Sequence, residues 1–177
     1  LEKVRSRSLA MHQSQELNEV VMVLFEKLKD LQIPSTAVAI QTFREDSKDM
    51  QVFVCGDVGT GLVINYYLLP YFNHRIINDY HAAHKDRSDF YIGNYSKKEK
   101  DSFYDYVLKL PELKDLPSEV EQMIRQSTHY SITMVPAEKS LIAVNDFEGK
   151  VLAESEVGII KRFAKVFDQA YTRFLDL

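Results

Sequence analysis

The chain contains one cysteine and no tryptophan in 177 residues. With Cys55 as its single thiol it has no internal disulfide, which is typical of a protein in a reducing compartment. A chain of this length buries enough apolar surface to form one stable domain without a covalent cross-link. We therefore expect a cytoplasmic, single-domain protein.

Long apolar runs and an excess of positive charge are also missing. No run approaches the roughly 20 residues needed to cross a bilayer, and none resembles a signal peptide. Lysine and arginine number 22 against 26 aspartate and glutamate, a formal net charge of -4. Because nucleic acid requires a basic surface, we predict no nucleic-acid partner, and no membrane contact by this segment.

Recognisable catalytic motifs are absent as well. The chain has no Gly-x-Ser-x-Gly elbow, no His-Glu-x-x-His pair, and no nucleophile with a base at a recognisable spacing. We predict that this segment is not an enzyme, and a scattered active site is the alternative.

What the chain does contain is a regular order of apolar patterns. A stripe from Leu17 to Leu31 predicts a first helix, which Pro34 ends because its ring disfavours helix at the residue before it. The later elements are strands at 36–44, 50–55 and 62–69, a helix at 71–86, a strand at 89–95, a helix from Ser96, a short helix capped by Ser118, strands at 128–135 and 140–147, and a last helix capped by Ser155. Strands joined by hairpins pair antiparallel, so we predict an α+β fold with a central antiparallel sheet of about six strands.

Both ends of the chain show heptad spacing. The apolar positions are Leu1, Val4 and Met11 at one end, and Ile160, Phe163, Phe167, Ala170, Phe174 and Leu177 at the other. No Gly, Asn or Pro ends the last helix, so we expect a module cut from a longer protein. The spacing predicts a homodimer seam of Phe163, Phe167, Ala170 and Phe174. Ordinary amphipathic helices at the ends of a domain are an equal alternative.

The same ends carry a resemblance to a known family. Leu1–His12 with Glu16-Leu17, and Lys161–Phe167 with Tyr171–Leu177, are similar to helices that enter and leave GAF-like sensor domains of bacterial signalling proteins. Such domains stand upstream of a histidine kinase or a nucleotide cyclase. The resemblance implies one module over residues 1–177, with 1–13 and 168–177 as signalling-helix extensions. It also implies terminal helices together on one face of the sheet, connecting helices on the other, a homodimer, and an output domain in cis.

The family often encloses a small-molecule pocket, but the resemblance names no ligand here. Some GAF domains hold a bilin through a cysteine–histidine signature, whereas Cys55 stands alone in a predicted strand. The signature of cyclic-nucleotide GAF domains is not visible either. The cofactor, if any, is unknown.

Aromatic side chains mark the place where a pocket is expected. Rings with polar tips stack a planar ligand and fix it with hydrogen bonds. The pocket candidates are Phe53, Tyr67, Tyr71, His74, Phe90 and Tyr130. A filled core without a cavity is the alternative for each of them.

Two other patterns have a functional and a plain interpretation. His74, His81 and His84 share a predicted helix and suit zinc, but a solvated polar face is favoured, so we predict no metal. Residues 56–61 faintly resemble a phosphate-binding loop, but no lysine follows and we predict a hairpin turn.

These patterns together predict a non-catalytic sensory and dimerisation module of a signal-transduction protein. It would relay a small-molecule or conformational signal through its terminal helices. The alternatives are a structural spacer without a ligand and a small-molecule enzyme.

Overall fold

The structure is a computed structural model that describes residues 14–175 of the chain. The predicted extension at 1–13, and the last two residues of the one at 168–177, lie outside the described residues. The described elements are, in order, α2 (Ser14–Asp30), β1 (Ala37–Arg44), β2 (Ser47–Asp57), β3 (Leu62–Leu69), α3 (Arg75–Lys85), β4 (Tyr91–Tyr95), α4 (Lys97–Val107), the short 3-10 helix η1 (Pro111–Leu113), α5 (Ser118–Gln126), β5 (Tyr130–Pro136), β6 (Ser140–Asp146) and α6 (Glu154–Leu175).

The six strands form one open antiparallel sheet in the order β3-β2-β1-β6-β5-β4. The centre of the sheet joins distant parts of the chain, because β1 pairs with β2 on one side and with β6 on the other. Ala39, for example, lies opposite both Val54 and Ala143. The predicted α+β class with a six-stranded antiparallel sheet is confirmed.

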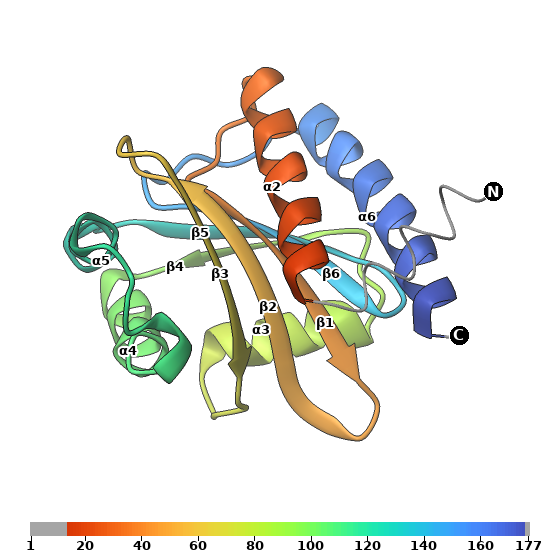
Figure 1. Cartoon of the computed structure of the whole chain (residues 1–177), viewed down its shortest axis with the longest axis horizontal. Coiled ribbons are helices and arrows are strands. Elements are labelled where there is room, and N and C mark those ends of the chain that lie inside the picture. Colours follow the sequence, from red (N-terminus) through yellow and green to blue (C-terminus); the bar gives the residue numbers. More distant parts are fainter. Residues whose placement is uncertain (1–13, 176–177) are drawn as a thin grey trace.

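One face of the sheet carries the first and last described helices, α2 and α6 (Figure 1). Their apolar stripes share a core with strand residues such as Val38, Ile40 and Val144. The two helices run in opposite directions, so that α2 begins at the end of the sheet where α6 ends (Figure 1). The predicted pairing of these helices on one face is confirmed for the described residues.

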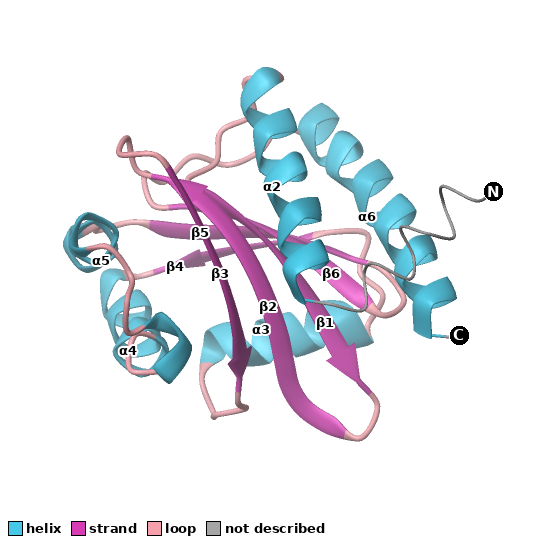
Figure 2. Ribbon diagram, in the orientation of Figure 1, coloured by secondary structure: helices cyan, strands magenta, loops and turns pink. Residues whose placement is uncertain are grey.

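The other face is covered by α3, α4 and α5, as Figure 2 shows. Its core joins helix residues such as Ile76, Phe103 and Ile124 to strand residues such as Ala39 and Met134. Successive strand residues therefore serve opposite cores: Val38 and Ile40 lie under α2 and α6, and Ala39 lies under α3 to α5.

Several predicted element ends need correction. The first helix ends before Pro34 through a left-handed Gln32, with φ of 57°. The Ile33 amide bonds the Leu28 carbonyl and the Gln32 amide bonds the Lys29 carbonyl, a Schellman ending whose apolar pair, Leu28 and Ile33, is buried. The second strand also begins earlier than the predicted residue 50, because β2 starts at Ser47 opposite Arg44.

Two predicted serine caps are wrong. Ser118 is the first residue of α5 and the cap position is Pro117, which makes no side-chain cap bond. Ser155 lies inside α6, and the Glu156 carboxylate accepts from the Ala153 amide at its start. A carboxylate in the first helical turn thus replaces the predicted hydroxyl.

The predicted dimer seam is wrong for Phe167. Its side chain is buried against the sheet with Ile160 and Ala164, and it stacks on Tyr171 at 5.7 Å between ring centroids. Phe163 and Ala170 are half-buried against the same core, and the Phe174 side chain lies outside what the structure describes. The three-and-four spacing on α6 therefore serves the fold of this chain, which was the alternative interpretation.

Candidate ligand cavity

A cavity of about 100 Å³ lies between the sheet and the helices α4 and α5. The sheet supplies its floor through residues of β1, β2 and β3, and α4, η1 and α5 supply its walls. Most of the lining is apolar, including Val52, Val54, Leu113, Val120 and Met123. Aromatic rings complete it, in agreement with the expectation that a pocket lies beneath the connecting helices.

The polar groups of the cavity form a short chain of hydrogen bonds. The Tyr130 hydroxyl donates to Oδ1 of Asn145 at 2.5 Å, and its oxygen lies 2.9 Å from the Tyr104 hydroxyl. Because the Tyr130 proton is already engaged, the Tyr104 hydroxyl is the donor of the second bond. The chain ends where the Asn145 amide nitrogen donates to the Ala143 carbonyl.

Gln41 lies on the same wall and is incompletely bonded. It is 3% exposed and lines the cavity from β1. Its amide oxygen Oε1 has no hydrogen-bond partner among the described residues. Burying a carbonyl oxygen without a hydrogen-bond donor costs about 1–3 kcal/mol of folding free energy. Oε1 is therefore the polar atom of the cavity that most needs a donor.

The tyrosines of the cavity stay protonated at neutral pH. Burial is the main cause that raises the pKa of Tyr104 to about 12, and burial also raises the pKa of Tyr67, Tyr80 and Tyr130. Protonated phenols donate and accept hydrogen bonds but do not serve as bases near neutral pH. These side chains are therefore suited to binding and not to proton abstraction.

Two of the six predicted pocket residues, Tyr67 and Tyr130, line the cavity. Phe53 and Phe90 belong to the core on the opposite face, beneath α2 and α6, and so do not face it. Tyr71 is exposed and donates to Asn78 outside the cavity. For these three residues the pocket prediction is corrected.

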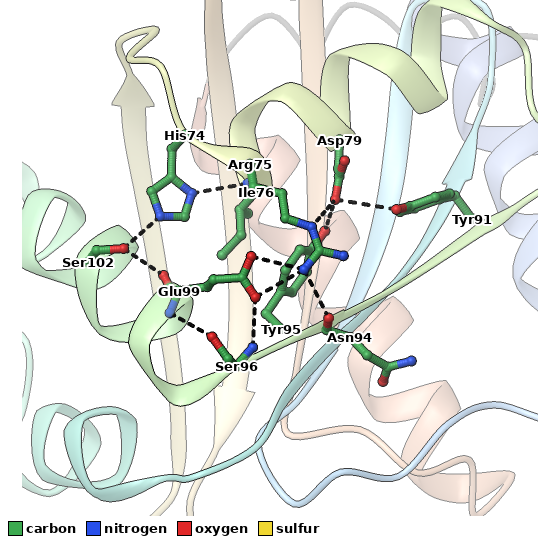
Figure 3. Close-up of polar contacts among 10 residues, drawn as sticks. All are labelled: His74, Arg75, Ile76, Asp79, Tyr91, Asn94, Tyr95, Ser96, Glu99 and Ser102. Carbon is green, nitrogen blue, oxygen red and sulfur yellow. Dashed lines mark hydrogen bonds and ion pairs between the residues drawn. The ribbon is translucent and has the colours of Figure 1, made fainter.

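His74 also lies outside the cavity, where it has a structural task. Its Nδ1 accepts from the Ile76 amide as the N-cap of α3, and its Nε2 lies 2.8 Å from the Ser102 hydroxyl of α4 (Figure 3). His74 thereby links the start of α3 to α4, and the pocket prediction is corrected for it too.

A second link between these helices centres on Arg75. Its guanidinium lies between the Glu99 carboxylate, at 2.9 Å, and the Tyr95 ring, at 4.8 Å from the centroid (Figure 3). Glu99 in turn closes a capping box with Ser96 at the start of α4. The Ser96 amide and then Arg75 lower the pKa of Glu99 by hydrogen bonding. Arg75 therefore fixes the start of α4, the helix whose Phe103, Tyr104 and Val107 wall the cavity.

Lys100 fixes α5 in the same way from inside the molecule. Its side chain is fully buried, and Nζ donates to the carbonyls of Ile124 and, at 2.6 Å, of Ser127 at the end of α5. Asp101 supplies a carboxylate at 2.9 Å. A cation at the negative end of a helix satisfies carbonyls that have no partner within the helix. Lys100 thus joins the two helices that enclose the cavity.

Comparison of the chain with protein-family models, curated proteins and solved structures found no match. The cavity and its place in the fold are therefore the basis for assigning a function. Within residues 14–175, no helix combines the length and the apolar character needed to span a membrane.

The histidines considered as metal ligands are engaged elsewhere. His81 and His84 bond the backbone carbonyls of Lys48 and Glu138 through Nε2, and His84 stacks on Phe43 at 3.9 Å. In the part of the chain that the structure describes, no three His, Cys, Asp or Glu side chains come together as a metal site would require.

Acid should weaken the fold through these histidines. Burial lowers the pKa of His74, His81 and His84 below the ordinary 6.5. As pH falls below about 6.5 the unfolded chain takes up protons that the folded chain takes up less readily, so stability is lost. We expect the melting temperature to fall between pH 7.5 and 5.5. The double variant His81→Asn/His84→Asn should show a flatter slope, and an equal slope would contradict this assignment.

The glycine-rich segment forms the predicted hairpin turn. It joins β2 to β3, which pair antiparallel from Asp57 opposite Leu62. Oδ1 of Asp57 accepts from the amides of Gly59 and Gly61, whose φ values of 102° and 115° suit glycine. Asp57 is the one charged residue on the cavity lining within the described chain, and its turn already uses that carboxylate.

Proposed function

We propose that this segment is a non-catalytic, GAF-like sensory module that relays occupancy of the cavity to its terminal helices. The observation that carries the proposal is that cavity and helices share strands. On β1, Ala39 and Gln41 line the cavity, while Val38 and Ile40, the residues between and before them, pack beneath α2 and α6. A ligand that shifts β1 therefore acts on both faces at once.

The other central strand is arranged in the same way. On β6, Asn145 lines the cavity and Val144 belongs to the core under α2 and α6. Packed cores resist gradual deformation. A small movement of these strands therefore favours a discrete change in the position of α6 over a gradual shift. Terminal helices on one face and connecting helices over a cavity on the other also agree with what the family resemblance implies.

The chemistry of the lining supports a binding function over a catalytic one. Its ionisable side chains other than Asp57 are tyrosines that burial keeps protonated. Asp57 is engaged in the β2–β3 turn. The lining therefore offers hydrogen bonds and apolar contacts, which are the requirements of a binding pocket.

A homodimer through the terminal helices belongs to the same proposal, on a different surface from the predicted seam. Val23 on α2 and Val166 on α6 are exposed, at 58% and 66%. Exposed apolar side chains on both helices suit a contact with a second copy of the chain. In such a dimer, a shift of α6 would be passed to an output domain in cis.

Sedimentation tests the dimer. We expect Val166→Asp to convert a dimeric protein to a monomer, because it places a charge in the proposed contact. Val151→Asp, at another exposed valine outside the helices, is the matched control. A dimer in both variants would reject this surface.

Native mass spectrometry, followed by denaturation of the same sample, tests for a ligand. A dimer that releases a small mass on denaturation supports the sensor and gives the weight of its ligand. A dimer without added mass favours the structural spacer.

The relay has its own test in a variant that fills the cavity without a ligand. Val120→Phe places a ring in the cavity from α5, and Leu62→Phe adds the same ring at an exposed position of β3. We expect amide hydrogen exchange in α6 to change at least threefold in Val120→Phe relative to Leu62→Phe, with β4, the edge strand that does not line the cavity, unchanged. Equal exchange in α6 would reject the relay.

A further inference from the structure

We propose that the cavity binds an uncharged, one-ring aromatic molecule that carries an O–H or N–H donor, recognised by Oε1 of Gln41. The inference rests on the proposed function, since it names the ligand class of the same cavity.

The size of the cavity sets the upper limit of the ligand. An engineered apolar cavity of about 150 Å³ in a protein core is large enough to bind benzene. The cavity here measures about 100 Å³ and is partly open to solvent. Because this volume is smaller than that of the benzene-binding cavity, one six-membered ring with a small substituent is the upper limit, and a nucleotide or a bilin is far too large.

The lining excludes a charged ligand. A buried ion needs a partner of opposite charge, and no lysine, arginine or histidine of the described chain lines the cavity. An anion would lie beside Asp57 and the tyrosines without a cation, and a cation would find Asp57 already engaged by two backbone amides.

The rings that surround the space favour an aromatic ligand. Tyr67 rises from β3, Tyr104 from α4 and Tyr130 from β5, and Phe147 closes the wall beside them. The Tyr104 and Tyr130 rings meet edge-on at 5.6 Å, and Tyr130 lies 4.7 Å from Phe147. A further ring placed among them gains the same offset and edge-on contacts.

Gln41 sets the requirement for a donor. Its Oε1 is a buried acceptor on the cavity wall without a donor in the described chain. Because side chains alternate along a strand, Gln41 lies on the same face of β1 as Ala39 and Phe43, which pack in the core under α3 to α5. An apolar residue at this position would be enough to pack that core. A ligand hydroxyl or amine that donates to Oε1 removes the cost of burying this oxygen.

Three probes of similar size test the proposal by isothermal titration calorimetry: phenol, toluene and benzoate. Phenol carries a hydroxyl group where toluene carries a methyl group, and benzoate carries a negatively charged carboxylate there. We expect phenol to bind at least tenfold more tightly than toluene, and benzoate not to bind. Toluene binding as tightly as phenol would overturn the role of Oε1, and benzoate binding most tightly would overturn the uncharged class.

Gln41→Leu gives a second measurement on the same residue. We expect it to weaken phenol binding at least tenfold and to leave toluene binding within threefold, because it removes the acceptor and keeps the apolar volume. Retained toluene binding also shows that the variant is folded. Equal losses for both probes would overturn the assignment.

The outcomes separate this inference from the proposed function. If phenol binds as expected and leaves α6 exchange unchanged, the ligand class stands and the relay fails. If toluene is preferred, the ligand class fails and α6 exchange with toluene decides the relay. If none of the three probes binds, the ligand class is overturned, and the exchange of Val120→Phe decides the relay without any ligand.

Discussion

Phe167→Ala should lower the free energy of unfolding by about 3–5 kcal/mol, the usual cost of truncating a buried phenylalanine. The side chain is 6% exposed and packs between α6 and the sheet, where its removal leaves a cavity among Ile160, Ala164 and Tyr171. For a domain of this size the expected fall in melting temperature is about 6–20 °C. Thermal unfolding followed by circular dichroism measures it.

Gln169→Ala is the matched control, because Gln169 lies two residues after Phe167 on α6 and is exposed. We expect it to change stability by no more than about 0.5 kcal/mol. Equal stability of the two variants would mean that Phe167 does not lie in the core of this chain. A loss of dimer without a loss of stability in Phe167→Ala would restore the seam predicted from heptad spacing.

Lys100→Met is the second large effect that we expect. Methionine preserves the length and apolar stem of the side chain but removes the ammonium group that the Ile124 and Ser127 carbonyls accept from. Leaving buried carbonyls and the Asp101 carboxylate without this partner should cost about 3–5 kcal/mol. Chemical denaturation measures the loss as a lower midpoint.

Lys98→Met is the control for this variant, since Lys98 is an exposed residue of the same helix. The same substitution there removes a charge without removing a buried hydrogen bond, and we expect a change of no more than about 0.5 kcal/mol. Hydrogen exchange should also report faster opening of α5 in Lys100→Met alone. Unchanged protection of α5 would contradict the assignment of Lys100 as the group that holds it.

The order of elements and the layers could be predicted because they depend on local periodicity. The apolar stripe of α2 and the alternation of side chains along β1 can each be recognised within a short stretch of sequence. The face to which Phe53 points could not be predicted. Val52, Phe53 and Val54 are apolar at successive positions because β2 has cores on both faces, and no alternation distinguishes the two.

The parts of the site that sequence patterns missed depend on distant contacts. Lys100 lies in the run Lys97–Asp101, which reads as a solvated helix start, and its burial depends on the end of α5. Gln41 offered a usable signal, since it is a polar residue in the inward row of a buried strand. The spacing of Phe167 fits a coiled-coil seam and a packed amphipathic helix equally, so only the position of the sheet decides between them.

The pairing of β1 with β6 at the centre of the sheet has a consequence for biosynthesis. Thr36 and Asp146, hydrogen-bonded beside that junction, are 110 positions apart. As the chain leaves the ribosome, β1, β2 and β3 can form a meander long before β6 exists, and β1 then presents an unpaired edge. Such an edge is a template for intermolecular pairing, and closure between distant segments is slow. Nascent chains halted before residue 140 should therefore need chaperone protection that chains released beyond α6 do not.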